Sequence, residues 1–326
     1  MARGAPLLRI GGTWRPEAAD LARAARALQL RSRREVAGAL AGGYRSAFRG
    51  GGIEFEESRP YTPGDDVRAI DWNALARTGT AYVKHYREER DQTLLLLVDV
   101  SASMAFGSRG PAKGAVAARS AALLAAAAAY AGDRVALWTF DRGLRSELAP
   151  GRGEAHGLSV LRALIEAASP GEGGTALAPL LARVCERVAR RAIVFLLSDL
   201  RDDALLASDA AGRRLRASLA AAAQRHDLVA GFVVDPREET LPEAGTLRVA
   251  DPEAPGRSLL LASGSRTARR RYAAAARMRE RLLERRLRAA GADWLVLRSD
   301  GDPLRTLGRF LAERAALRVR GRGVRR

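Results

Sequence analysis

The sequence predicts an α/β protein with a doubly wound, mostly parallel sheet flanked by helices. Short, continuous apolar runs alternate with helical segments from residue 93 to residue 316. This alternation is typical of parallel strands joined by right-handed helical crossovers. The run at 94–98 contains only leucine and valine, which indicates a strand buried on both faces.

Residues 1–92 do not follow this pattern and are predicted to form an N-terminal helical and irregular extension. Residues 16–40 carry apolar side chains at helical spacing. Five glycines within residues 42–52 predict an irregular, mobile or closely packed loop. Residues 53–91 have turn patterns at 62–65 and 78–80 and no helical period, and 81–89 can form an extended strand.

Residues 93–316 are predicted to form the α/β domain. Strands are expected at 94–98, 134–140, 144–148, 192–197, 228–234 and 294–297, the second and third of which form a hairpin. Helices are expected at about 113–131, 156–168, 177–190, 204–226, 266–290 and 302–316. Residues 317–326 are predicted to be a basic, frayed tail.

The chain is strongly basic, with a net charge of +18 from 55 Lys and Arg against 37 Asp and Glu. Such an excess fits a nucleic acid or another anionic partner. It also fits a genome that favours arginine codons, with the arginines on solvated helix faces. The second interpretation is favoured, because aromatic residues make up only 5% and are not interleaved with the arginines.

A single cysteine, Cys185, excludes a disulfide within the chain and is compatible with a reducing cytoplasm. The first fifteen residues lack the apolar stretch of a signal peptide. The least charged window, 114–132, is mostly alanine and is interpreted as a buried helix rather than a membrane span. The sequence therefore predicts a cytoplasmic protein without a membrane span.

Three oxygen-bearing side chains follow the first apolar strand at alternate positions, namely Asp99, Ser101 and Ser103. Carboxylate and hydroxyl oxygens favour Mg²⁺ or Mn²⁺ over zinc or copper. A carboxylate at the end of an apolar strand also needs a partner, because burying it unpaired is costly. The alternative is a capping loop, in which these side chains satisfy free backbone N–H groups.

Two further strand-end loops supply matching groups. The glycine-rich residues 171–175 end on Thr175, and the apolar run 192–197 is followed by Ser198 and Asp199. Ligands of open α/β sheets bind at the carboxyl ends of the strands. We therefore predict that Thr175 and Asp199 join the first loop around Mg²⁺ or Mn²⁺. The alternatives are that Thr175 caps the next helix and that Asp199 pairs with Arg201.

These five residues, in this order on alternating strands and helices, resemble the metal-ion-dependent adhesion site of von Willebrand factor type A domains. The resemblance implies that Ser101, Ser103 and Thr175 bind the metal directly, and that Asp99 and Asp199 act directly or through water. It also implies that a Glu or Asp of a partner protein completes the shell.

Two upstream segments, 50–55 and 59–77, resemble the signature of the bacterial family called domain of unknown function 58. The resemblance covers roughly residues 35 to 235. It implies a partner or adaptor of MoxR-type AAA+ ATPases in protein assembly or maturation. Within the second segment, a structural ion-pair network that locks the extension onto the sheet is preferred over a second site. The residues that suggest a second site are Asp65, Asp66, Arg68, Asp71, Trp72 and Arg77, and the network would be formed by the arginines and aspartates among them.

The sequence thus favours a non-enzymatic, metal-dependent protein-binding module. One alternative is a magnesium-dependent phosphoryl hydrolase with Asp99 as nucleophile, although serines stand where an acid/base carboxylate would be expected. A second alternative is nucleic-acid binding through the helix at 266–290, which has ten arginines against Glu280 and Glu284.

Overall fold

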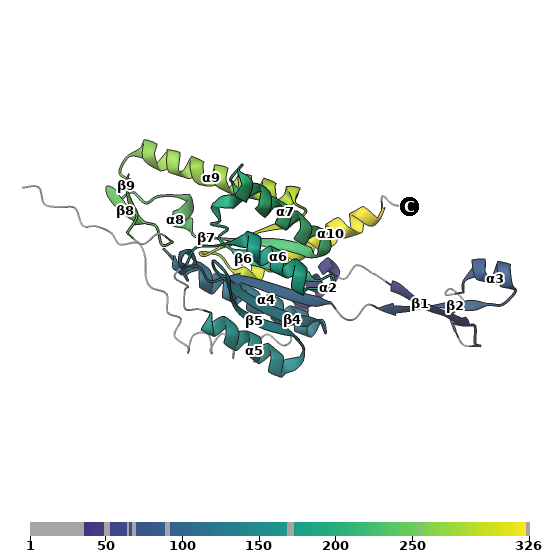
Figure 1. Ribbon diagram of the computed structural model, residues 1–326. Coiled ribbons are helices and arrows are strands. Elements are labelled where there is room, and N and C mark those ends of the chain that lie inside the picture. Colours follow the sequence, from purple (N-terminus) through teal and green to yellow (C-terminus); the bar gives the residue numbers. More distant parts are fainter. Residues whose placement is uncertain are drawn as a thin grey trace, which may run out of the picture.

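A six-stranded sheet forms the centre of the protein in the computed structural model (Figure 1). The structure describes residues 36–48, 53–63, 65–66, 70–88, 92–167, 173–253 and 256–323. The strands are β3 (Thr93–Asp99), β4 (Arg134–Phe140), β5 (Leu144–Gly151), β6 (Ile193–Ser198), β7 (Asp227–Val234) and β10 (Asp293–Arg298). Their order is β10-β7-β6-β3-β4-β5, and only the β4–β5 pair is antiparallel. The predicted fold class is confirmed.

Helices cover both faces of the sheet (Figure 1). One face carries α2 (Val36–Phe48), α4 (Lys113–Tyr130), α5 (Gly153–Glu166) and α10 (Pro303–Gly323), and the other carries α6 (Leu177–Arg187), α7 (Ala210–Arg225) and α9 (Arg266–Ala289). Leu94, Leu96 and Val98 of β3 pack on the first face, and Leu95 and Leu97 pack on the second. Successive strand side chains point to opposite faces, so β3 is buried on both, as predicted.

The predicted glycine-rich loop at 42–52 is wrong in its first part, because α2 continues through Phe48. The ring of Phe48 lies 5.7 Å from the ring of Phe195 in the core. A Cβ on Gly43 would lie 3.4 Å from the Cβ of Leu311, so the glycine lets α2 approach α10 closely. This packing outweighs the roughly 1 kcal/mol by which each glycine disfavours a helix.

The last helix is longer than predicted, because α10 extends to Gly323 through most of the expected tail at 317–326. Arg314 forms ion pairs with Asp227 and Asp293, and its guanidinium lies 4.5 Å from the centre of the Phe48 ring. Arg318 lies 2.8 Å from the second carboxylate oxygen of Asp227. These ion pairs fix the helix to the ends of two strands.

Replacing Arg314 with methionine is expected to lower the free energy of unfolding by about 1–3 kcal/mol, because partly buried charged hydrogen bonds are lost. Arg309→Met on the same helix is the matched control, because the Arg309 side chain is 76% exposed and its ion pair with Glu313 is long, at 3.8 Å. Its effect should stay within about 0.5 kcal/mol. Urea unfolding measures both, and equal effects would contradict the anchoring role of Arg314.

An arm projects away from the sheet in Figure 1. It consists of β1 (Ile53–Pro60), α3 (Trp72–Thr78) and β2 (Tyr82–Glu88), and β1 pairs with β2 in antiparallel fashion. The strand predicted at 81–89 is confirmed by β2, whereas β1 and α3 were not predicted. Several predicted features lie outside the described residues, namely the helix before residue 36, glycines 50–52, Arg68, Gly171 and Glu172.

Two acidic residues of the arm have partners within it. Asp71 caps α3 by accepting hydrogen bonds from the backbone N–H groups of Asn73 (3.1 Å) and Ala74 (3.2 Å). Asp65 pairs with Arg59 at 2.7 Å, and the Arg59 side chain is 36% exposed. The prediction of a buried network on the sheet is therefore wrong for Asp65, which pairs with a partly exposed arginine of the arm.

A short insertion lies between β7 and α9, where the sequence predicted no regular element. It contains α8 (Pro236–Glu239) and a hairpin of β8 (Thr246–Ala250) and β9 (Ser258–Ala262). Two 3₁₀ turns, Ala102–Ala105 and Asp203–Leu205, follow β3 and β6. No helix within the described residues is both long and apolar enough to cross a membrane.

Candidate metal centre

The candidate site lies where the chain order of the sheet reverses. From β3 the chain adds β4 and β5 on one side, and β6, β7 and β10 lie on the other. The register pairs Val98 with Leu197, so the next residues, Asp99 and Ser198, emerge side by side. Ligands of open α/β sheets bind at such a switch point.

The first loop folds back over its own strand. The backbone N–H of Ser101 donates to Oδ1 of Asp99 at 2.8 Å, and the Oγ atoms of Ser101 and Ser103 lie 3.2 Å apart. All three side chains are at most 1% exposed. One oxygen of Asp99 is thus used in a turn, as the capping alternative expects, while its other oxygen faces the neighbouring loops.

Thr175 reaches the first loop from the segment between α5 and α6. Its Oγ1 donates to Oδ2 of Asp99 at 3.0 Å and lies 3.1 Å from Oγ of Ser101. The backbone N–H of Ala102 donates to the carbonyl of Gly173 at 3.1 Å, which ties the two loops together. The structure therefore joins these loops as the sequence predicted.

The capping alternative for Thr175 is wrong. Helix α6 begins at Leu177, and its cap position, Ala176, has no capping side chain. Instead, Oδ2 of Asp202 accepts a hydrogen bond from the N–H of Leu177 at 2.8 Å. The Thr175 hydroxyl is left to face Asp99.

Asp199 joins the cluster through a buried ion pair. Its side chain is 2% exposed, and its Oδ2 lies 2.6 Å from Nζ of Lys113, which is fully buried. Arg201, the partner that the sequence offered as an alternative, lies further away, at 3.4 Å. Asp199 directly follows Ser198, whose hydroxyl donates to Asp99. All five predicted residues thus converge, and Lys113 orients one of them.

An uncommon backbone conformation follows Asp199. Leu200 has a φ of 54°, and it is the one described residue other than glycine in the left-handed region. Its N–H donates to Oγ of Ser198 at 2.9 Å, and that hydroxyl donates to Oδ2 of Asp99 at 2.5 Å. A left-handed leucine costs roughly 1–2 kcal/mol. The fully buried Leu200 side chain and these bonds hold the turn that aims Asp199 at the cluster.

The two carboxylates have opposite pKa shifts. Burial, and then the nearby charge of Asp199, raise the pKa of Asp99 to about 7. Burial also raises the pKa of Asp199, but Lys113 and Arg201 outweigh it, so the net pKa of Asp199 is lowered. The charge of Asp199 is therefore balanced by cations of the protein. By contrast, none of the main influences on the pKa of Asp99 is a positively charged side chain.

The donors around Asp99 are all oxygen atoms, which fits a hard cation such as Mg²⁺ or Mn²⁺. The hydroxyl of Ser101 lies 3.2 Å from that of Ser103 and 3.1 Å from that of Thr175, which also donates to Asp99. Each hydroxyl has one proton, so a cation would relieve the oxygen–oxygen contacts that no proton bridges. A bound cation would act electrostatically and attract a further carboxylate.

The protein carboxylates alone do not form a metal cage. In the part of the chain that the structure describes, no three His, Cys, Asp or Glu side chains converge as ligands. The hydroxyls of Ser101, Ser103 and Thr175 would therefore have to provide much of the shell, together with water. Mg²⁺ commonly keeps several waters in protein sites.

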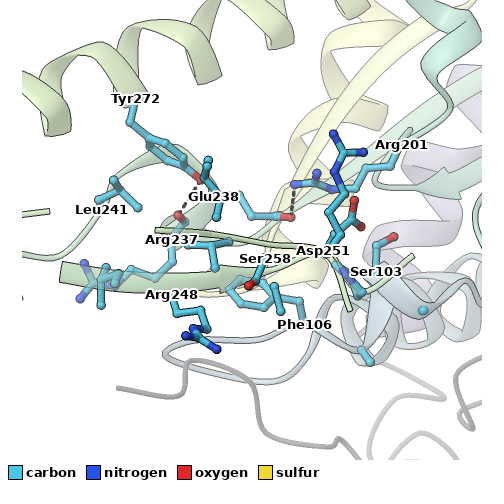
Figure 2. Close-up of a pocket in the computed structure, with 18 of the residues that line it drawn as sticks. Ser103, Phe106, Arg201, Arg237, Glu238, Leu241, Arg248, Asp251, Ser258 and Tyr272 are labelled. Carbon is cyan, nitrogen blue, oxygen red and sulfur yellow. Dashed lines mark hydrogen bonds and ion pairs between the residues drawn. The ribbon is translucent and has the colours of Figure 1, made fainter. Parts of the chain in front are cut away.

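A groove of about 810 Å³ opens beside Ser103. It runs between the first loop and the β8–β9 hairpin, and Figure 2 shows Arg248 and Ser258 on its hairpin side. In the same view, Arg201 reaches across to Glu238, to which it is bonded at 2.7 Å. Four arginines against three acidic residues line the groove, namely Arg201, Arg237, Arg248, Arg257, Asp203, Glu238 and Asp251.

Three residues of the cluster were not predicted. Ser198 precedes Asp199 and could have been found from the register of the two strands. Lys113 is one of only two lysines in an arginine-rich chain, which was the available clue. Glu253 lies far along the sequence in a turn without a motif, and only the fold brings it to Ser103.

The fold and the cluster define the class of this protein. It is an α/β protein in which buried carboxylates and hydroxyls lie at the carboxyl ends of the strands of a mostly parallel sheet. The chain belongs to the family described as protein of unknown function DUF58, whose model matches residues 57–281. The match begins later and ends later than the expected range of 35 to 235.

The relatives and similar structures are bacterial. Uncharacterized proteins of Mycobacterium tuberculosis and Mycobacterium bovis are 33% identical over 298 residues, 90% of this chain and 90% of each relative. The conserved hypothetical protein BatB of Bacteroides thetaiotaomicron has a TM-score of 0.41 and 16% identity, covering 70% of this chain and 99% of that chain. An aerotolerance-related membrane protein of Bacteroides fragilis also has a TM-score of 0.41, with 12% identity and coverage of 69% and 99%.

Proposed function

We propose that this chain is a non-enzymatic, metal-dependent protein-binding module of the von Willebrand factor type A kind. The observation that supports this proposal is the convergence of Asp99, Ser101, Ser103 and Thr175 within hydrogen-bonding distance of one another. Asp199 adjoins them, because it follows Ser198, whose hydroxyl donates to Asp99. The cation would be Mg²⁺ or Mn²⁺, and its remaining position would receive a carboxylate of the partner.

The partner we propose is an AAA+ ATPase of the MoxR type, acting with this chain in the assembly or maturation of other proteins in the cytoplasm. Membership of the DUF58 family supports this choice, because the resemblance to that family implies a role as partner of such an ATPase. The groove beside Ser103 supports an acidic contact, because its arginines would attract and guide an Asp or Glu side chain.

Calorimetric titration with MgCl₂ and MnCl₂ tests the metal part of the proposal. We expect saturable binding by the wild type and none by Asp99→Ala. Affinity capture with and without a chelator tests the protein part. The wild type should retain an AAA+ ATPase only without the chelator, and Ser101→Ala should retain it in neither case. A wild type that binds neither ion would contradict the proposal.

Two other functions are open to direct tests. A magnesium-dependent phosphoryl hydrolase would turn over p-nitrophenyl phosphate, and loss of that turnover in Asp99→Ala would overturn the binding-only proposal. A nucleic-acid-binding protein would retard DNA or RNA at low salt, with an affinity that falls steeply as salt rises. Helix α9 already uses Arg279 and Arg286 to bind backbone carbonyls of the fold.

A further inference from the structure

Residues 251–253, which follow β8, lie beside the candidate site. The backbone N–H of Asp251 donates to the carbonyl of Arg257 at 3.0 Å, which closes the base of the loop. Oδ1 of Asp251 accepts from the N–H of Glu253 at 3.0 Å. Figure 2 shows Asp251 next to Ser103 at the end of the groove. The loop therefore places Glu253 at the edge of the oxygen cluster.

The carboxylate of Glu253 faces into that cluster. Burial raises the pKa of this carboxyl, Ser103 lowers it, Asp199 raises it and Arg201 lowers it, so all three side chains lie near it. A Cβ on Gly174 would lie 2.9 Å from Oε2 of Glu253, so this oxygen also lies against the loop that carries Thr175. Residues from three separate loops thus surround one carboxylate.

This position is unfavourable without a counter-charge. Oε1 of Glu253 is buried and has no hydrogen-bond partner within the described residues. Lys113 binds Asp199 and Glu238, and Arg201, the cation near Glu253, is itself bonded to Glu238 at 2.7 Å. A partly buried carboxylate with one unpaired buried oxygen next to another carboxylate is costly, and a hairpin loop could avoid that cost by turning its side chain to solvent. A cation among the hydroxyls would make the inward position favourable.

We propose that Glu253 is an internal ligand of the metal site, so that the β8–β9 hairpin covers the site until an acidic side chain of the partner displaces it. The inference rests on the proposed function, because it requires a cation at the cluster. It adds that the chain carries its own substitute for the partner carboxylate. Mg²⁺ then binds the hairpin to the sheet, and partner binding releases it.

Titration of the full chain with MnCl₂ tests this inference in wild type, Glu253→Ala and Glu243→Ala. Glu243 is the matched control, because it lies on the same insertion with its side chain 73% exposed and pairs with Arg269 away from the cluster. Glu253→Ala should weaken Mn²⁺ binding at least about tenfold. Glu243→Ala should match the wild type. Added sodium acetate should restore affinity in Glu253→Ala and leave the wild type unchanged.

Hydrogen exchange of the hairpin amides gives a second measurement that does not depend on affinity. Mn²⁺ should slow exchange at 246–262 in the wild type and not in Glu253→Ala. Unchanged Mn²⁺ affinity in Glu253→Ala, or a hairpin that does not respond to Mn²⁺ in the wild type, would overturn the inference. If Asp99→Ala abolishes binding while Glu253→Ala does not, only the internal ligand is refuted. If the wild type binds no Mn²⁺, the proposed function fails as well.

Discussion

Lys113→Met is expected to lower the free energy of unfolding by about 3–5 kcal/mol, because it leaves a buried charge without its partner. Nζ of Lys113 lies 2.6 Å from Asp199 and 2.7 Å from Glu238, and the side chain is fully buried. Methionine keeps the length and apolar stem of lysine, so the loss measures the charge. Urea unfolding at neutral pH, monitored by circular dichroism, provides the measurement.

A second substitution separates the ion pair from simple packing. Lys113→Met combined with Asp199→Asn should recover part of the loss, because a neutral amide no longer requires the ammonium group. Glu238 keeps a partner in both variants, since Arg201 lies 2.7 Å from it. A loss below about 1 kcal/mol in the single variant, or no recovery in the double variant, would contradict the structural role of Lys113.

Asp99→Asn is expected to make the metal-free protein more stable than the wild type, and Mg²⁺ is expected to narrow that difference. Burial, and then Asp199, raise the pKa of Asp99 to about 7, so the folded state disfavours its charge. Asparagine has a similar shape and no charge, and should add on the order of a few kcal/mol at pH 8 without metal. At a Mg²⁺ concentration 100 times its Kd, the wild type alone should gain about 2.7 kcal/mol.

The pH dependence of this difference follows from the direction of the shift. Because the folded pKa of Asp99 lies above its unfolded value, the protonated group adds stability at pH values below its unfolded pKa. That stability is lost as the pH rises through about 7. The advantage of Asp99→Asn should therefore be small at pH 4 and grow up to pH 8. Thermal melts with EDTA or MgCl₂ measure it, and a variant that is less stable than wild type in EDTA at pH 8 would refute the argument.

The centre of the sheet was predictable because its strands are buried on both faces. Continuous apolar runs predicted β3 and β6 to within a residue or two, since few other structures place five or six apolar residues in succession. The β8–β9 hairpin lacks that property. Leu259 and Leu260 are 62% and 59% exposed, so nothing in their local pattern shows that a hairpin packs beside the sheet.

Only the residues of the site that directly follow strands were predictable from the sequence. Asp99 and Asp199 follow apolar runs, and the topology of a parallel sheet places both on one edge. The contribution of Lys113 depends on a side chain that crosses from the start of α4 to Asp199, a contact between residues 86 positions apart. Glu253 depends on a loop whose position no local rule determines. Sequence patterns thus locate the edge of the sheet, and tertiary contacts determine which charges meet there.

Strand β3 also links two distant parts of the molecule. The arm of β1, α3 and β2 precedes it, and β3 begins at Thr93 and ends at Asp99. Seven extended residues span about 20 Å, so the arm and the oxygen cluster lie at opposite ends of one strand. Figure 1 shows the arm leading away from the side of the sheet opposite the β8–β9 hairpin. A protein bound to the arm and a second protein bound at the oxygen cluster would approach from opposite directions, so neither would block the other.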